Sequence, residues 1–85
     1  MARPKKKRIV GFKIKNSFFR PSNYSLMTAD IKTDELEAMR LCDMEELFQE
    51  IAAKKMGVSR RTLERILFSG RKKIADALLN GKSIK

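Results

Sequence analysis

Residues 49–68 read QEIAAKKMGVSRRTLERILF, and this stretch decides the fold. Ala53 stands four residues before Gly57, and Ser59 follows Gly57 by two. A small residue lets two helices cross closely, glycine takes the positive φ that ends a helix, and serine is a good N-cap for the next helix. The spacing therefore predicts a helix-turn-helix, in which the second helix of the pair enters the DNA major groove.

Apolar residues on both sides of this turn fall on helix faces. They predict a second helix over about 48–56 and a third over about 60–79 that ends at Asn80–Gly81. Gly70 is expected to let a neighbouring helix approach closely. The other residues expected to face inward are Ala52, Ala53, Met56, Val58, Leu63, Ile66, Leu67, Ile74, Ala77 and Leu78.

The segment from residue 33 predicts a first helix. Thr33 or Asp34 is expected to cap it, and Asp34 followed by Glu37 resembles a capping box. The helix is expected to end near 42–43, and its inward residues are Leu36, Met39, Leu41 and Cys42. Cys42 admits two interpretations, a packed core thiol or a redox-sensing thiol.

These elements predict an all-α fold, a three-helix helix-turn-helix domain over 33–80. A basic, largely extended arm is expected over 1–32, with a short tail over 81–85. Phe18, Phe19, Tyr24 or Leu26 is expected to pin the extended chain onto the helices. The arm residues expected to follow DNA are Arg3, Lys5, Lys6, Lys7 and Arg8. The same basic run also reads as a nuclear import signal.

The charge of the chain is segregated. Residues 1–20 hold eight basic residues and no acid, 21–50 hold two basic and eight acidic residues, and 51–85 hold ten basic and two acidic residues, giving a net charge of +10. Two basic parts around an acidic one favour an oriented polyanion binder. With no histidine and one cysteine, a Cys/His metal cluster and a histidine-assisted nucleophile are excluded. We therefore expect no metal, no cofactor, no small-molecule substrate and no enzymatic activity.

The outward stripe of the third helix carries the functional prediction. It holds Arg61, Arg65, Phe68 and Lys72, with Arg60 beside it at the N-terminus. Arginine reads guanine O6 and N7 bidentately, so Arg60, Arg61 and Arg65 are the expected base contacts. Glu64 is expected either to pair with Arg60 or Arg61 or to accept a hydrogen bond from cytosine. The expected phosphate contacts are Gln49, Ser59, Thr62, Arg71, Lys72 and Lys73.

Three blocks of the sequence resemble a known family. The opening MARPKKKR, the later DELEAMRL and the block GVSRRTLERIL are similar to a prokaryotic family of small, functionally uncharacterised, predicted DNA-binding proteins. The C-terminal half of that family resembles sigma-factor region four, which reads promoter −35 elements. The resemblance implies base contacts at Arg60, Arg61 and Arg65. Where the family usually reads Gly-Leu-Ser before the second helix, this chain reads Glu46-Leu47-Phe48. The serine cap is therefore missing, and the first two helices could run on.

Two functions follow as hypotheses. The first is sequence-specific binding of double-stranded DNA by a transcriptional regulator, working as a homodimer through Ile74, Leu78 and Leu79 or through Phe18–Phe19. The second is a sigma-like module that binds RNA polymerase or another protein through its acidic 34–50 face. RNA binding has little support, since no aromatic platform alternates with basic residues. No apolar run approaches the roughly 20 residues that span a membrane, and a cytoplasmic, nucleoid-associated protein is expected.

Overall fold

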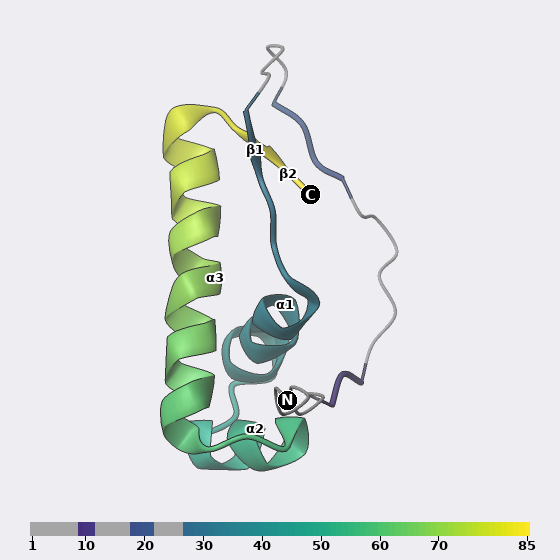
Figure 1. Ribbon diagram of the computed structural model, residues 1–85, viewed down its shortest axis with the longest axis vertical. Helices are drawn as coiled ribbons and strands as arrows, with labels where there is room; N and C mark the ends of the chain where they lie inside the picture. Colours follow the sequence, from purple (N-terminus) through teal and green to yellow (C-terminus); the bar gives the residue numbers. More distant parts are fainter. Residues whose placement is uncertain (1–8, 12–17, 22–26) are drawn as a thin grey trace, which may run out of the picture.

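Three helices and one small strand pair make up the part of the chain that the computed structural model describes, residues 9–11, 18–21 and 27–85. The elements in chain order are β1 (Thr28–Ala29), α1 (Thr33–Met39), the π-helical segment η1 (Arg40–Met44), α2 (Gln49–Met56), α3 (Arg60–Asn80) and β2 (Ser83–Ile84). Figure 1 shows α3 running along one side of the molecule, with α2 across its N-terminal end and the strands beside its C-terminal end.

The core lies where the three helices meet. Its buried members are Ala38, Leu41, Ala52, Ala53, Met56, Leu63, Ile66 and Leu67. The predicted seam between α2 and α3 is confirmed, and Val58, Met39, Cys42 and Leu47 pack partly buried against it. The prediction for Leu78 is wrong, because this side chain is 74% exposed. It lies two turns after the exposed Arg71 on the same flank of α3, whereas the adjacent Ala77 is buried.

The bounds of α2 and α3 agree with the prediction to within a residue. The Ser59 hydroxyl accepts a hydrogen bond from the Thr62 N–H at 3.1 Å, as an N-cap does. Gly57 and Gly81 end the two helices at φ 68° and 64°. The expected close approach at Gly70 is also present, since a Cβ there would lie 3.0 Å from Met39 Cε and 3.1 Å from Glu35 Cβ.

The start of α1 differs from the prediction. Its N-cap is Lys32, so capping by Thr33 or Asp34 and the Asp34–Glu37 box are wrong. The physical reason is the Glu35 carboxylate, which accepts the Lys32 backbone N–H at 2.8 Å and fixes the helix start one residue earlier. At the other end, the helix widens into η1 and continues to Met44, slightly beyond the predicted end.

The first two helices do not run on into each other. Residues 45–48 separate them, and Glu46 adopts φ 54°, a left-handed conformation that glycine takes at low cost. Phe48 provides no side-chain cap for α2, as expected from the missing serine. Glu46 thus takes the backbone conformation that a glycine would favour at this turn.

The strand pair corrects the all-α prediction to a mostly helical fold. β1 and β2 pair in parallel, with Thr28 opposite Ser83 and Ala29 opposite Ile84. Ile84 also forms an antiparallel bridge with Phe19, so the C-terminal residues are paired rather than a free tail. Gly81 turns the chain back toward β1, and the Lys82 N–H donates to the Ala77 carbonyl at 2.9 Å.

The described residues near the N-terminus form backbone hydrogen bonds, from Ile9 to Met56 at 3.1 Å and in both directions between Phe19 and Ile84 at 2.7 Å. Phe18 and Phe19 remain 47% and 57% exposed, so neither ring is pinned onto the helices. Tyr24 and Leu26, the other expected anchors, lie outside the described residues, as do the arm residues Arg3 to Arg8.

Candidate nucleic-acid interface

The basic residues of α3 fall into two groups. Those on its flanks form ion pairs with acidic residues, whereas those in the middle of its exposed surface form none within the described chain. On one flank, Arg71 forms a two-point ion pair with Asp43 of η1, with N···O distances of 2.5 and 3.3 Å. On the same flank, Arg60 Nε lies 3.6 Å from Glu50 of α2. On the opposite flank, Lys73 Nζ lies 2.8 Å from Glu35 of α1. The acidic part of the chain therefore neutralises the edges of α3.

The middle of the α3 surface keeps its positive charge. Arg61 and Arg65 are exposed, and no acid among the described residues lies within ion-pair distance of either. Lys72 continues the same stripe; it lies close enough to Asp76 to lower the pKa of that carboxyl, after Lys82 and Asn80, but forms no ion pair with it in the described chain. These three residues share one face because they recur at helical spacing.

The Glu35 carboxylate holds the Lys73 side chain against α1 through an ion pair. The carboxylate is buried and accepts hydrogen bonds from Lys73, from the Ser69 hydroxyl at 2.5 Å and from the Lys32 N–H. Burial raises the pKa of Glu35, but these bonds outweigh burial and leave the pKa below its usual value. Sequence reasoning assigned Lys73 to phosphate and Glu35 to nothing, because the two residues stand 38 positions apart.

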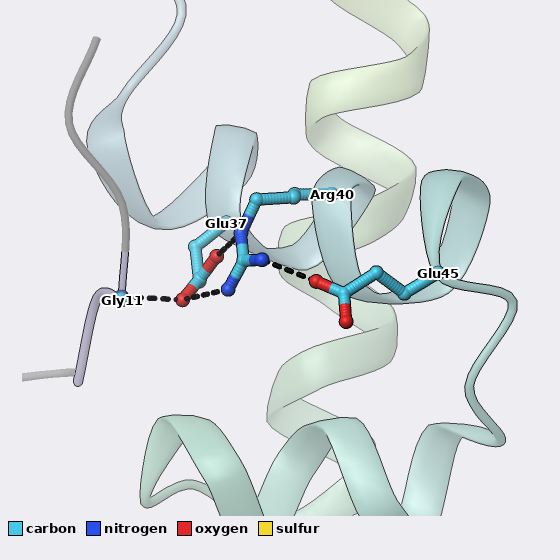
Figure 2. Close-up of polar contacts among 4 residues, drawn as sticks. All are labelled: Gly11, Glu37, Arg40 and Glu45. Atoms are coloured by element: carbon cyan, nitrogen blue, oxygen red, sulfur yellow. Dashed lines mark hydrogen bonds and ion pairs between the residues drawn. The ribbon is translucent and has the colours of Figure 1, made fainter.

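Residues 9–11 are held close to the turn between α2 and α3 by hydrogen bonds from their backbone N–H groups. The Ile9 N–H donates to the Met56 carbonyl at 3.1 Å, and its side chain packs against Gly57. The Gly11 N–H donates to Glu37 Oε2 at 2.7 Å. Figure 2 shows how this carboxylate is held in place.

Glu37 is the first member of a three-residue ion network. Arg40 donates to both of its oxygens, at 2.6 and 3.2 Å, and also donates to Glu45 (Figure 2). Burial raises the pKa of Glu37, yet the bonds from Arg40 and Gly11 bring it below the usual value. The network thus holds an ionised carboxylate ready to bind the backbone of the N-terminal segment.

The remaining predicted residues take varied positions. Thr62 is bonded to Ser59 through both its N–H and its hydroxyl. Gln49 opens α2 half-buried, and its Oε1 has no hydrogen-bond partner among the described residues. Glu64 forms no ion pair with Arg60 or Arg61 in that part of the chain, since Arg60 pairs with Glu50.

Cys42 lies half-buried against the core. Burial and the neighbouring Asp43 raise the pKa of its thiol, although Arg71 works in the opposite direction. A thiol with a raised pKa is less reactive, which favours the packed-core interpretation.

The described residues hold no group of three or more acidic, cysteine or histidine side chains placed to bind a metal ion. No helix among them combines the length and the apolar character that a membrane span requires.

Comparison with known proteins places the chain in a family. The model of the family "Protein of unknown function DUF134" matches residues 1–85. UPF0251 proteins of Caldicellulosiruptor bescii, Ruminiclostridium cellulolyticum and Clostridium botulinum are 48%, 46% and 48% identical to the chain over its whole length. The chain spans 61%, 67% and 56% of the length of these relatives, respectively. No solved structure matches it. The chain therefore belongs to the family of proteins of unknown function DUF134, whose named members are the UPF0251 proteins.

Proposed function

We propose that this protein binds double-stranded DNA sequence-specifically through a helix-turn-helix formed by α2 and α3, and that it regulates transcription. One observation carries the proposal: acidic residues pair with the flanks of α3, while Arg61 and Arg65 in the middle have no acidic partner among the described residues. Such a distribution attracts a polyanion to one face of one helix.

The proposed reading residues are the exposed arginines at the start of α3. Arg61 and Arg65 contact base edges, and Arg60 joins them once DNA displaces its exposed, 3.6 Å ion pair with Glu50. Ser59, Thr62, Gln49 and Lys72 contact phosphate. Arg71 and Lys73 are not among the proposed phosphate contacts, because each already holds an acidic partner.

The basic arm is proposed to contact the DNA beside α3. Arg8 directly precedes Ile9, whose backbone is hydrogen-bonded to the last residue of α2. The arm therefore starts next to the turn that leads into α3, and its charges at Arg3 and Lys5 to Arg8 reach DNA held on that helix. Tethering at this point raises the effective concentration of the arm at the DNA.

Binding to a labelled duplex pool at several salt concentrations tests this proposal. The double variant Arg61→Ala/Arg65→Ala is expected to lose at least tenfold in affinity, since each arginine–guanine pair is worth about 1–3 kcal/mol. The matched control is Lys54→Ala/Lys55→Ala, which removes the same charge from exposed positions on α2. The control is expected to bind within about threefold of the wild type, because surface charges away from the groove act weakly. Equal losses in the two double variants would contradict a reading face on α3.

A specific observation supports the second candidate, a sigma-like protein-interaction module. Met44 at the end of η1 and Phe48 just before α2 are 79% and 77% exposed, and Glu45, Glu46 and Glu50 near them in the chain are also exposed. Apolar side chains rimmed by charge are typical of protein-binding sites. Arg65→Ala discriminates the two functions, because it weakens DNA binding under the first proposal and leaves partner binding unchanged under the second.

A further inference from the structure

Phe68 is the one aromatic residue on the outward stripe of α3. It is 55% exposed, whereas the adjacent Leu67 is fully buried in the core. An exposed phenylalanine adds nothing to the core and leaves apolar area in water. At this position on the basic stripe, the ring is available to a surface that covers it in a complex.

The neighbours of Phe68 restrict what this surface is. Arg65 lies one turn before it, Lys72 one turn after it and Arg61 two turns before it. Phe68, Arg65, Thr62 and Ser69 also line one wall of a groove, whose other wall at the start of α1 holds Lys32, Asp34 and Glu35. A partner that covers the ring must accept the positive charges of the stripe at the same time. Charge complementarity thus favours a polyanion over an apolar protein face.

DNA offers one apolar group at the depth that a helix in the major groove reaches. That group is the 5-methyl of thymine, and phenylalanine is one of the side chains that contact it. Along the helix axis Phe68 lies about 4.5 Å from Arg65 at a rise of ~1.5 Å per residue. This distance corresponds to one or two base-pair steps of about 3.4 Å.

We propose that Phe68 is a specificity residue that packs against the 5-methyl group of a thymine one or two base pairs from the guanine contacted by Arg65. The inference rests on the proposed DNA-binding function and deepens it, since it adds apolar readout to the arginine contacts. It predicts that the binding site contains a G and a T in close succession on the face read by α3.

Replacing thymine by deoxyuridine tests this contact, because the exchange removes only the methyl group. The DNA site is first selected from a random duplex pool with the wild-type protein. Each thymine of this site is then exchanged singly, and affinity is measured for the wild type and for Phe68→Ala. The wild type is expected to lose about three- to fivefold at one thymine, which corresponds to the burial of one methyl group. Phe68→Ala is expected to bind the thymine and deoxyuridine duplexes equally. Its thermal unfolding is expected to match the wild type, since the ring is outside the core.

Ile51→Ala serves as the matched control. Ile51 is an exposed apolar residue like Phe68, 45% exposed, but it belongs to α2 and not to the outward stripe of α3. This variant is expected to keep the wild-type preference for thymine.

The outcomes separate the two proposals. If a motif depends on Arg61 and Arg65 but no thymine exchange matters, or if Phe68→Ala keeps the preference, the role of Phe68 is wrong and DNA reading stands. If no motif is enriched at all, the proposed function fails and the role of Phe68 fails with it.

Discussion

Lys72 and Lys73 are adjacent lysines with different surroundings. Lys73 compensates the buried Glu35 carboxylate at 2.8 Å, whereas Lys72 is exposed on the stripe without an ion pair among the described residues. Lys73→Met is expected to lower the free energy of unfolding by about 1–3 kcal/mol, because it leaves a buried charge with fewer partners. Urea unfolding measures the change.

Lys72→Met is the control for this prediction. It removes the same charge and is expected to change stability by no more than about 0.5 kcal/mol. Under the proposed function it also weakens DNA binding, because Lys72 contacts phosphate. Equal stability losses in the two variants would contradict the structural role of Lys73.

Glu35 and Glu37 make stability depend on acid pH. Both carboxyls have a lowered pKa in the folded chain, so the unfolded chain binds more protons at low pH. Their contribution is complete above the unfolded value of about 4.3 and is lost as the pH falls through the lower folded value. Urea midpoints are expected to be constant from pH 7 to 5.5 and to fall steeply below about pH 4.5. A Glu35→Gln variant with an equally steep fall would contradict this assignment.

The sequence predicted only a capping role for Glu37, which is wrong, and no role for Glu35. In the sequence, both look like ordinary acids near the start of a helix. Their partners Lys73 and Gly11 stand 38 and 26 positions away, so only the tertiary fold brings them together. The outward arginines could be predicted, because helical spacing alone determines which residues lie opposite the apolar face.

The connection between η1 and α2 contains a strained residue, Glu46. Glu46 adopts φ 54°, a conformation that costs a residue with a Cβ roughly 1 kcal/mol relative to glycine. Glu46→Gly is therefore expected to raise the free energy of unfolding by about 0.5–1 kcal/mol. Thermal or urea unfolding measures the gain, and the exposed Glu45, whose φ is −90°, provides the control position. Glu45→Gly is expected to destabilise the protein, since it also removes a partner of Arg40.

Local signals decide which elements were predicted correctly. The turn at Gly57, the cap at Ser59 and the apolar spacing lie within one continuous stretch, and they predicted α2 and α3 to within a residue. β1 and β2 have two residues each and are far apart in the sequence, one before α1 and the other after α3. Two residues show no alternation, so no local pattern predicts this pairing. The widened turn of η1 depends likewise on packing rather than on propensity.

For the whole molecule, the arrangement of charge matters more than its sum. A net charge of +10 would attract DNA from any direction, but the acidic part of the chain lies against both flanks of α3. Within the described chain, the outward stripe of α3 keeps its charge, as do the exposed Lys54 and Lys55 of α2. Under the proposed function, a positive field centred on α3 orients the encounter with DNA as well as accelerating it.

We expect the protein to bind its DNA site as a dimer. A single helix-turn-helix reads few base pairs, so we expect two copies on two half-sites. Leu78 and Leu79 are 74% and 84% exposed at the end of α3, which leaves them available for contact between copies. Native mass measurement with and without a selected duplex is expected to show two protein copies per site. A single copy under both conditions would contradict dimeric binding.

The central claim is that the outward stripe of α3 reads a DNA sequence, and selection from a random duplex pool at physiological salt tests it most directly. Wild-type protein is expected to enrich one motif of fixed length that contains guanines, and Arg61→Ala/Arg65→Ala is expected to enrich none. Binding without an enriched motif, lost as salt rises and unchanged in the double variant, would show that charge alone drives the interaction and would contradict the claim.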